Sequence, residues 1–193
     1  MGILLFALYV TYSKHLHIFF AFPAVYYSNL GPSSQMHEMP HVTNEVNIML
    51  GKPGEPSNIE LKFGAQDIKD LTIKNTLDAY SCTECGRCTE QCPANQTGKL
   101  LSPRKIMMDT RDRLEELQKD PNSTNTLLGN YISAEELRAC TTCQACVEAC
   151  PIQLSPLDII LELRRYQIME QSDAPGAWNA MFATIETNQA PWK

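Results

Sequence analysis

The sequence lacks the signals that mark several common functional classes. It has 16 Lys and Arg residues against 22 Asp and Glu residues, a net charge of −6, and so lacks the basic patch that nucleic-acid binding requires. It shows no Ser–His–Asp triad, no glycine-rich phosphate loop and no convincing pair of carboxylates. Independent substrate chemistry is therefore not expected of this chain.

Strand signals and aromatic residues are also scarce. No alternating Val, Ile and Thr run of useful length is present, which argues against a β-sheet. Only 8% of the residues are aromatic, whereas there are 12 prolines, a composition that suits helices separated by loops. With 193 residues, the chain is long enough for one domain with attachments.

No apolar run is long enough to span a membrane, which takes about 20 residues. Residues 3–10 are continuously apolar, and a second run, 18–22, stops at Pro23. We expect the chain to begin inside a transmembrane helix, so that residues 1–30 are its end, with Lys14 at the cytoplasmic edge. The alternative is a hydrophobic hairpin packed on the domain. Four tyrosines suit an interfacial belt: Tyr9, Tyr12, Tyr26 and Tyr27.

All eight cysteines fall into two copies of one pattern, C-x2-C-x2-C-x3-C-P. Pro93 and Pro151 end the two copies. The spacing is that of bacterial ferredoxins with a pair of [4Fe–4S] clusters, in which the fourth cysteine of each run binds the other cluster. We therefore expect two [4Fe–4S] clusters and one-electron transfer. Cluster one would be bound by Cys82, Cys85, Cys88 and Cys150, and cluster two by Cys140, Cys143, Cys146 and Cys92.

Other uses of eight cysteines fit less well. Zinc sites favour C-x2-C pairs separated by a longer gap, whereas each run here already supplies four sulfurs. Disulfides belong to oxidising compartments and small secreted chains. A thioredoxin-like pair would need a single C-x-x-C. A zinc-stapled interaction module remains a minor alternative.

The cysteine runs sit in a repeat that predicts an all-α fold. Each run is followed by a Ser-Pro pair, which begins a helix because serine caps and proline suits the first turn. We predict helices from Ser102 to Lys119, from a Ser133 capping box, from Ser155, and from Gly176 to Thr187, with a further helix capped by Thr72. The domain boundaries are 1–30, a linker at 31–66, and an α-helical ferredoxin with two pseudo-symmetric cluster-binding halves at 67–193.

Several polar residues near the cysteines could modify a cluster or serve as ligands. Hydroxyl groups beside the sulfurs could tune the potential, and basic side chains could stabilise an anionic cluster or dock an acidic partner, although ordinary solvated charges are the plainer interpretation. His37 and His41 are better explained as solvated linker residues. The tuning candidates are Thr83, Thr89, Thr141, Thr142, Arg87, Lys99 and Arg104.

The stretch Leu77–Cys88, with Cys92-Pro93-Ala94 and Leu101–Arg104, resembles the iron–sulfur subunits of heterodisulfide reductase. It also resembles the C subunit of anaerobic glycerol-3-phosphate dehydrogenase and the helical cluster domain of succinate dehydrogenase. Residues 12–17 resemble the end of a nitrate-reductase-gamma-like membrane domain, found in proteins that carry CCG domains downstream. By this resemblance the chain would be a fragment of a longer membrane-bound protein.

The resemblance implies the electron-transfer part of a membrane-associated oxidoreductase, on the cytoplasmic side of the cell membrane. Its partners would be a flavoprotein, a CCG-type domain or a quinone-linked membrane subunit. Haem b at His15 or His17 is implied only if further membrane helices are present, and a membrane-interface histidine is the plainer interpretation. The alternative function is a structural or redox-sensing cluster module that transfers no electrons in turnover.

Overall fold

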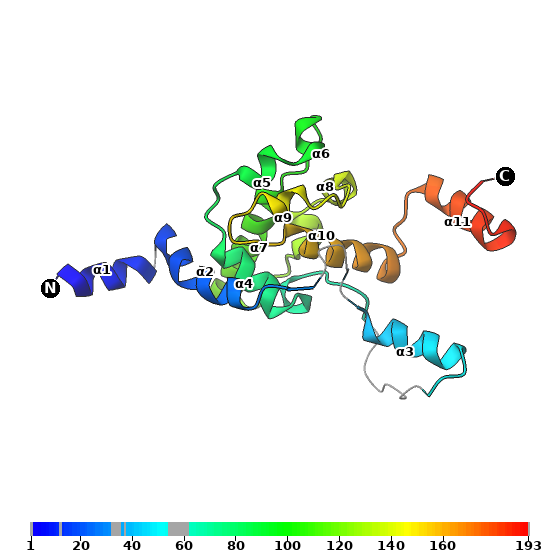
Figure 1. The fold of residues 1–193 in the computed structure, drawn as a ribbon, viewed down its shortest axis with the longest axis horizontal. Helices are drawn as coiled ribbons and strands as arrows, with labels where there is room; N and C mark the ends of the chain where they lie inside the picture. Colours follow the sequence, from blue (N-terminus) through cyan, green and yellow to red (C-terminus); the bar gives the residue numbers. More distant parts are fainter. Residues whose placement is uncertain (1, 12, 32–35, 37, 54–61, 193) are drawn as a thin grey trace.

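The regular elements of the structure are all helical. The structure is a computed structural model and describes residues 2–11, 13–31, 36, 38–53 and 62–192; across these ranges it contains no β-strand, which confirms the all-α prediction (Figure 1). The α-helices are α1 (Gly2–Thr11), α2 (His17–Tyr26), α3 (Pro40–Met49), α4 (Ile73–Ser81), α5 (Arg87–Glu90), α6 (Pro93–Gln96), α7 (Pro103–Lys119), α8 (Ala134–Ala139), α9 (Ala145–Glu148), α10 (Pro156–Arg165) and α11 (Gly176–Asn188). Short helical turns are η1 (Lys14–Leu16), η2 (Ile68–Asp70), η3 (Leu127–Tyr131) and η4 (Tyr166–Glu170).

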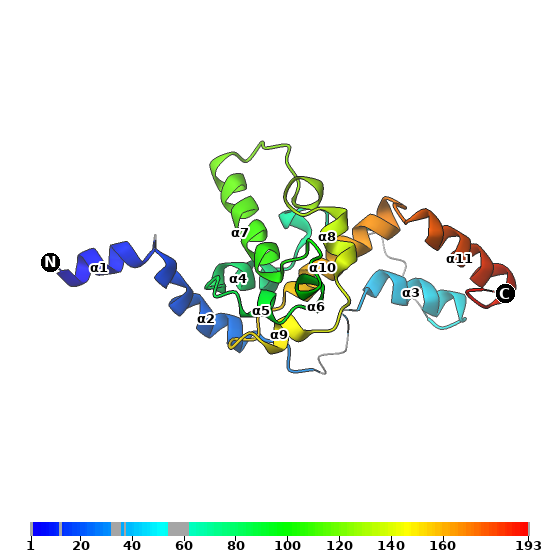
Figure 2. The same ribbon diagram turned by 90° about the horizontal axis from the view of Figure 1, so that it is seen from above.

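Helices α4, α7 and α10 form the centre of the molecule. Helix α7 packs against both α4 and α10, and the side chains between them exclude water. Ile106 and Met107 on α7 and Ile159 and Leu163 on α10 are fully buried. Burial of such side chains contributes about 1.5–3 kcal/mol each, so this contact holds the two cysteine-bearing halves together (Figure 2).

The helix starts predicted from the sequence are confirmed. Thr72 and Ser133 form capping boxes at the start of α4 and α8. The hydroxyl of Ser102 accepts from the Lys105 amide at 3.4 Å, and that of Ser155 accepts from the Asp158 amide at 3.2 Å. Each half therefore has one boxed helix before its cysteine loop and one Ser-Pro helix after it.

The segment before α4 joins the two halves. Ala65, within the segment predicted as a linker, is fully buried, and its amide donates to the Glu162 carbonyl of α10 at 3.0 Å. Two residues later, Asp67 accepts from Arg113 of α7 at 2.8 Å. In the same predicted linker, α3 forms a helix with no buried residue.

The amino-terminal helices reach the domain through α2. Helix α2 packs on α4, Ala24 is fully buried, and the rings of Phe20 and Tyr80 lie 6.0 Å apart. Helix α1 points away from the domain, at the end of the molecule opposite α3 and α11 (Figures 1 and 2). No helix in the described ranges is both long enough and apolar enough to cross a membrane.

Candidate metal centre

Both cysteine loops begin where a helix ends. Cys82 caps α4 with φ −69° and ψ 123°, and Cys140 caps α8 with φ −70° and ψ 129°. This extended conformation stops the helix and turns the chain outward. The first ligand of each run is therefore presented in the same way in both halves.

Each loop then turns twice through left-handed backbone conformations. Glu84 and Gly86 have φ of 60° and 86°, and Thr142 and Gln144, at the same places in the second run, have φ of 57° and 64°. Non-glycine residues rarely adopt these angles. The turn brings the Thr142 amide to 3.4 Å from the Cys140 sulfur, and the Glu84 amide likewise bonds the Cys82 sulfur.

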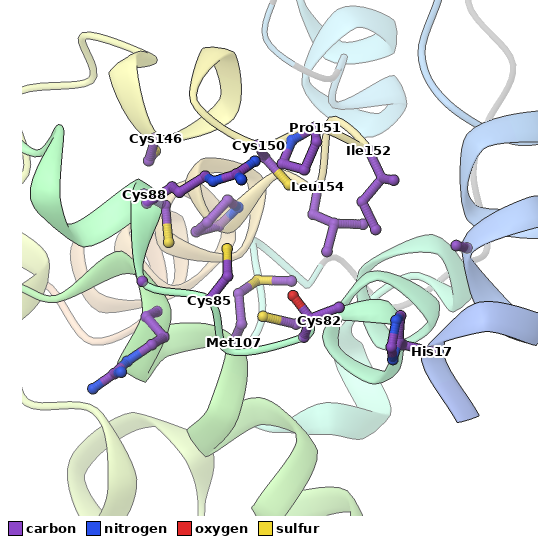
Figure 3. Close-up of a pocket in the computed structure, with 16 residues that line it drawn as sticks. His17, Cys82, Cys85, Cys88, Met107, Cys146, Cys150, Pro151, Ile152 and Leu154 are labelled. Carbon is purple, nitrogen blue, oxygen red and sulfur yellow. The ribbon is translucent and has the colours of Figure 1, made fainter. Parts of the chain in front are cut away.

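The first thiol group consists of Cys82, Cys85, Cys88 and Cys150. All four line one cavity of about 200 Å3, which Cys146 also reaches. Figure 3 shows the side chain of Cys150 on the side facing the first loop, although it belongs to the second cysteine run. The remaining wall is largely apolar, with Met107, Ile152 and Leu154. Thiols from two distant segments therefore line one space.

The second thiol group consists of Cys140, Cys143, Cys146 and Cys92. Besides burial, the neighbouring thiols of Cys92 and Cys143 raise the pKa of Cys140, and those of Cys140, Cys88, Cys92 and Cys143 raise the pKa of Cys146, so these side chains lie close together. Cys92 and Cys146 are buried and Cys143 is exposed. Helix α5, which carries Cys88, contacts α9, which carries Cys146, so the two groups lie side by side.

The protein environment disfavours free thiolates. Burial, helped by neighbouring thiols, raises the pKa of Cys88 to about 11 and that of Cys146 to about 12. Burial also raises the pKa of Cys82 and Cys140. Thiolate is the form that binds metal, so these groups lose protons when metal binds.

One of the predicted threonine hydroxyls reaches a sulfur. The Thr89 side chain bonds Cys88, and its oxygen lies 2.9 Å from that of Ser102 at the start of α7. The Thr142 hydroxyl instead donates to the Thr141 carbonyl at 2.7 Å. Thr89 therefore ties the first thiol group to α7.

Two arginines that the sequence reasoning missed lie beside the loops. Arg111 and Arg164 each lie nine residues after the serine of a Ser-Pro pair, a repeat that could have revealed them. Their charges act on Cys82 and Cys140, respectively. Of the predicted basic residues, Arg87 and Arg104 line the cavity of the first thiol group and are exposed, whereas Lys99 is exposed and does not line it.

The candidate histidines differ in position. His17 of α2 lines the cavity beside Cys82 (Figure 3), a contact that sequence spacing could not show. His15 is exposed, with its ring 3.5 Å from the Ser13 hydroxyl. His41 is half-buried on α3. His37 lies outside the described residues.

The donor set fits an iron–sulfur cluster. Sulfur is the ligand that such clusters use, and each group offers four thiols together with an amide that bonds one sulfur. Within the described ranges, no three His, Cys, Asp or Glu side chains are arranged to hold a single metal ion. A helical scaffold with two groups of four thiols defines the class of iron–sulfur electron carriers.

Comparison with known proteins identifies the family. Residues 81–154 match the 4Fe-4S dicluster domain. The chain is 30% identical to "Probable iron-sulfur-binding oxidoreductase FadF" of Bacillus subtilis, covering 98% of this chain and 30% of that protein. It is 33% identical to "EtfAB:quinone oxidoreductase" of Syntrophomonas wolfei (67% and 22%) and 31% identical to "Probable membrane-anchored ferredoxin" of Chromohalobacter salexigens (59% and 20%).

Further relatives are named as C subunits of heterodisulfide reductase, in agreement with the resemblance found in the sequence. No solved structure matches the chain. The chain spans less than a third of the length of the three relatives described above. It belongs to the iron–sulfur oxidoreductase family and is an electron-transfer module that carries iron–sulfur clusters.

Proposed function

We propose that the chain relays single electrons through two [4Fe–4S] clusters with exchanged fourth ligands. Cluster one takes Cys82, Cys85, Cys88 and Cys150, and cluster two takes Cys140, Cys143, Cys146 and Cys92. The observation that carries this proposal is that Cys150 lines the same cavity as the three cysteines of the first loop. The proposal includes three segments: a membrane segment at residues 1–30, a linker at 31–66 and the two-cluster domain at 67–193.

The residues of the chain hold the clusters and control their surroundings. A cluster accepts and returns one electron when bound. The amides of Glu84 and Thr142 bond the sulfurs of Cys82 and Cys140, and hydrogen bonds to sulfur shift a cluster's potential. Apolar side chains such as Met107 and Leu154 form part of the wall around the first group. Contact between α5 and α9 holds the two groups next to each other, which suits electron transfer between the clusters.

The relay would work within a membrane-associated oxidoreductase, on the cytoplasmic side of the cell membrane. Relatives named as a membrane-anchored ferredoxin and a quinone oxidoreductase support the membrane association. Helix α2 packs on α4, and its His17 lines the cavity of the first thiol group, so cluster one is the cluster nearer the amino-terminal segment. The partners would be a flavoprotein, a CCG-type domain or a quinone-linked membrane subunit. Haem b at His15 or His17 would need further membrane helices.

Metal content is the first test. We expect about eight iron and eight sulfide per anaerobically purified chain, with two interacting paramagnetic centres in the EPR spectrum of the reduced protein. Zinc without sulfide would overturn the proposal and leave an interaction module.

Cysteine variants test the exchange of ligands. Cys88→Ala and Cys143→Ala each remove a cysteine from one loop and identify the EPR signal of each cluster. If the fourth ligands are exchanged, Cys150→Ala perturbs the same signal as Cys88→Ala, and Cys92→Ala the same signal as Cys143→Ala. The reverse pairing would show that each run binds its own cluster.

A further inference from the structure

The two halves place an arginine at the same position but give it different partners. On α7, the Arg111 guanidinium donates to the Glu84 carboxylate at 2.6 Å. On α10, the Arg164 guanidinium donates to backbone carbonyls, to Leu137 at 3.0 Å and to Cys140 at 2.5 Å. One arginine is therefore neutralised by a carboxylate, and the other is held by neutral groups.

The main difference comes from one position in the cysteine loops, since the other carboxylate near Arg111, on Asp112, is exposed and 3.9 Å away. Glu84 and Thr142 are both two residues after the first cysteine, with φ of 60° and 57°. Both amides bond the preceding cysteine sulfur, so the backbone is alike and only the side chains differ. Among the described residues, no carboxylate forms an ion pair with Arg164.

The burial of the two arginines determines how strongly their charges act on the nearby sulfurs. The side chains of Arg111 and Glu84 are 20% and 18% exposed, so they form a largely buried pair without net charge. Arg164 is half-buried, and its charge acts on Cys140. Arg87 and Arg104 lie near the first group but are exposed, where water and salt screen their charge.

We propose that the unbalanced charge of Arg164 raises the reduction potential of cluster two, whereas Glu84 cancels the same effect of Arg111 on cluster one. The inference rests on the proposed two-cluster function. Reduction adds one negative charge to a cluster, and a nearby positive charge stabilises that form. Transfer of one electron, which oxidises cluster one and reduces cluster two, is favoured by this arrangement.

Potentiometric titration followed by EPR, on the full chain purified without oxygen, tests the role of the charge. Arg164→Gln lowers the potential of cluster two and leaves that of cluster one unchanged. We expect at least a tenfold shift in the electron equilibrium between the clusters, or about 59 mV for one electron. Arg164→Lys keeps the charge and retains most of the potential, whereas equal losses in both variants would show a structural role and overturn the inference.

Opposite changes at the equivalent positions Glu84 and Thr142 test the same idea without altering the hydrogen bonds of Arg164 to the backbone carbonyls. Glu84→Gln removes the close ion pair of Arg111, which keeps only a 3.9 Å contact with the exposed Asp112, and raises the potential of cluster one. Thr142→Glu supplies the missing carboxylate at a backbone conformation that glutamate already adopts in the first loop, and it lowers the potential of cluster two. Unchanged potentials in both variants, with both signals and full iron content retained, would overturn this inference and leave the relay standing. A wild-type chain without two clusters would overturn the relay itself.

Discussion

The short segment Gly64–Asp67 attaches to α10 and to α7 by opposite means. On α10 the contact is backbone against backbone. A side-chain carbon on Gly64 would lie 2.3 Å from the Glu162 carbonyl oxygen and 2.4 Å from the Tyr166 nitrogen. On α7 the contact is between charges, since Asp67 accepts two hydrogen bonds from Arg113 at 2.8 and 2.9 Å.

The difference follows from the residues that the repeat places on each helix. Arg113 and Tyr166 both lie eleven residues after the serine of a Ser-Pro pair. The Arg113 side chain is only 1% exposed and also pairs with Glu116 at 2.9 Å, so it needs nearby carboxylates. The equivalent residue in the second half, Tyr166, carries no such charge. The backbone at Gly64 can instead lie close to the helix backbone there, because glycine has no side chain. Equivalent surfaces of the two repeats can thus bind the same segment either through an ion pair or through close backbone packing.

Removing the ion pair between Asp67 and Arg113 should have the largest effect on the free energy of unfolding. Arg113→Ala leaves Asp67 and Glu116 without their buried partner, and loss of one member of such a pair costs about 3–5 kcal/mol. The measurement is the urea dependence of unfolding under anaerobic conditions. Arg138→Ala is the matched control, because Arg138 and its partner Asp173 are 33% and 58% exposed, and exposed pairs contribute about 0–1 kcal/mol. Similar losses in the two variants would contradict the importance of burial.

Filling the close approach should have the next largest effect. Gly64→Ala combines a left-handed backbone, at φ +71°, with contact against the α10 backbone, and we expect a loss of about 2–4 kcal/mol. Gly98→Ala separates the two causes, because Gly98 lies outside the cysteine loops and has φ +80° with nothing within 4 Å of an added carbon. It should lose only about 1 kcal/mol. Equal losses would mean that backbone conformation alone, and not the approach to α10, requires glycine.

The smallest expected effect is a pH dependence of folding stability that arises from the contact of Tyr131 with Glu116 on α7. The hydrogen bond from the Tyr131 hydroxyl to Glu116, at 2.7 Å, raises the pKa of Tyr131 to about 12. A raised tyrosine pKa stabilises the fold below the unfolded value of about 10, and this contribution is lost as pH rises toward 12. Thermal unfolding at pH 8, 10 and 11.5 measures it. Tyr131→Phe should lose less stability across this range than wild type, and parallel profiles would refute the linkage.

Local sequence rules predicted much of the fold and the candidate ligands. The caps at Thr72, Ser102, Ser133 and Ser155 act through groups three residues away, so they are readable without tertiary information. Helix α3 was missed because its turn-rich surroundings and mixed surface resemble a linker. The repeat places Arg111 and Arg164 at equivalent positions, but the closeness of these arginines and of His17 to the loops could not be predicted, because it depends on how α7, α10 and α2 pack.

The sequence by itself determined the helical class, the two cysteine loops and the chemistry of their sulfurs, because cysteine spacing and helix caps act over a few residues. Cysteine spacing also predicted that the fourth cysteine of each run joins the other loop, whereas the tertiary structure alone decided that α2 lies beside the first loop. It also decided that one of two equivalent arginines faces a carboxylate and the other does not. These features require segments far apart in the sequence to meet, as His17 and Cys82 do, and packing of buried surfaces, rather than local pattern, brings them together.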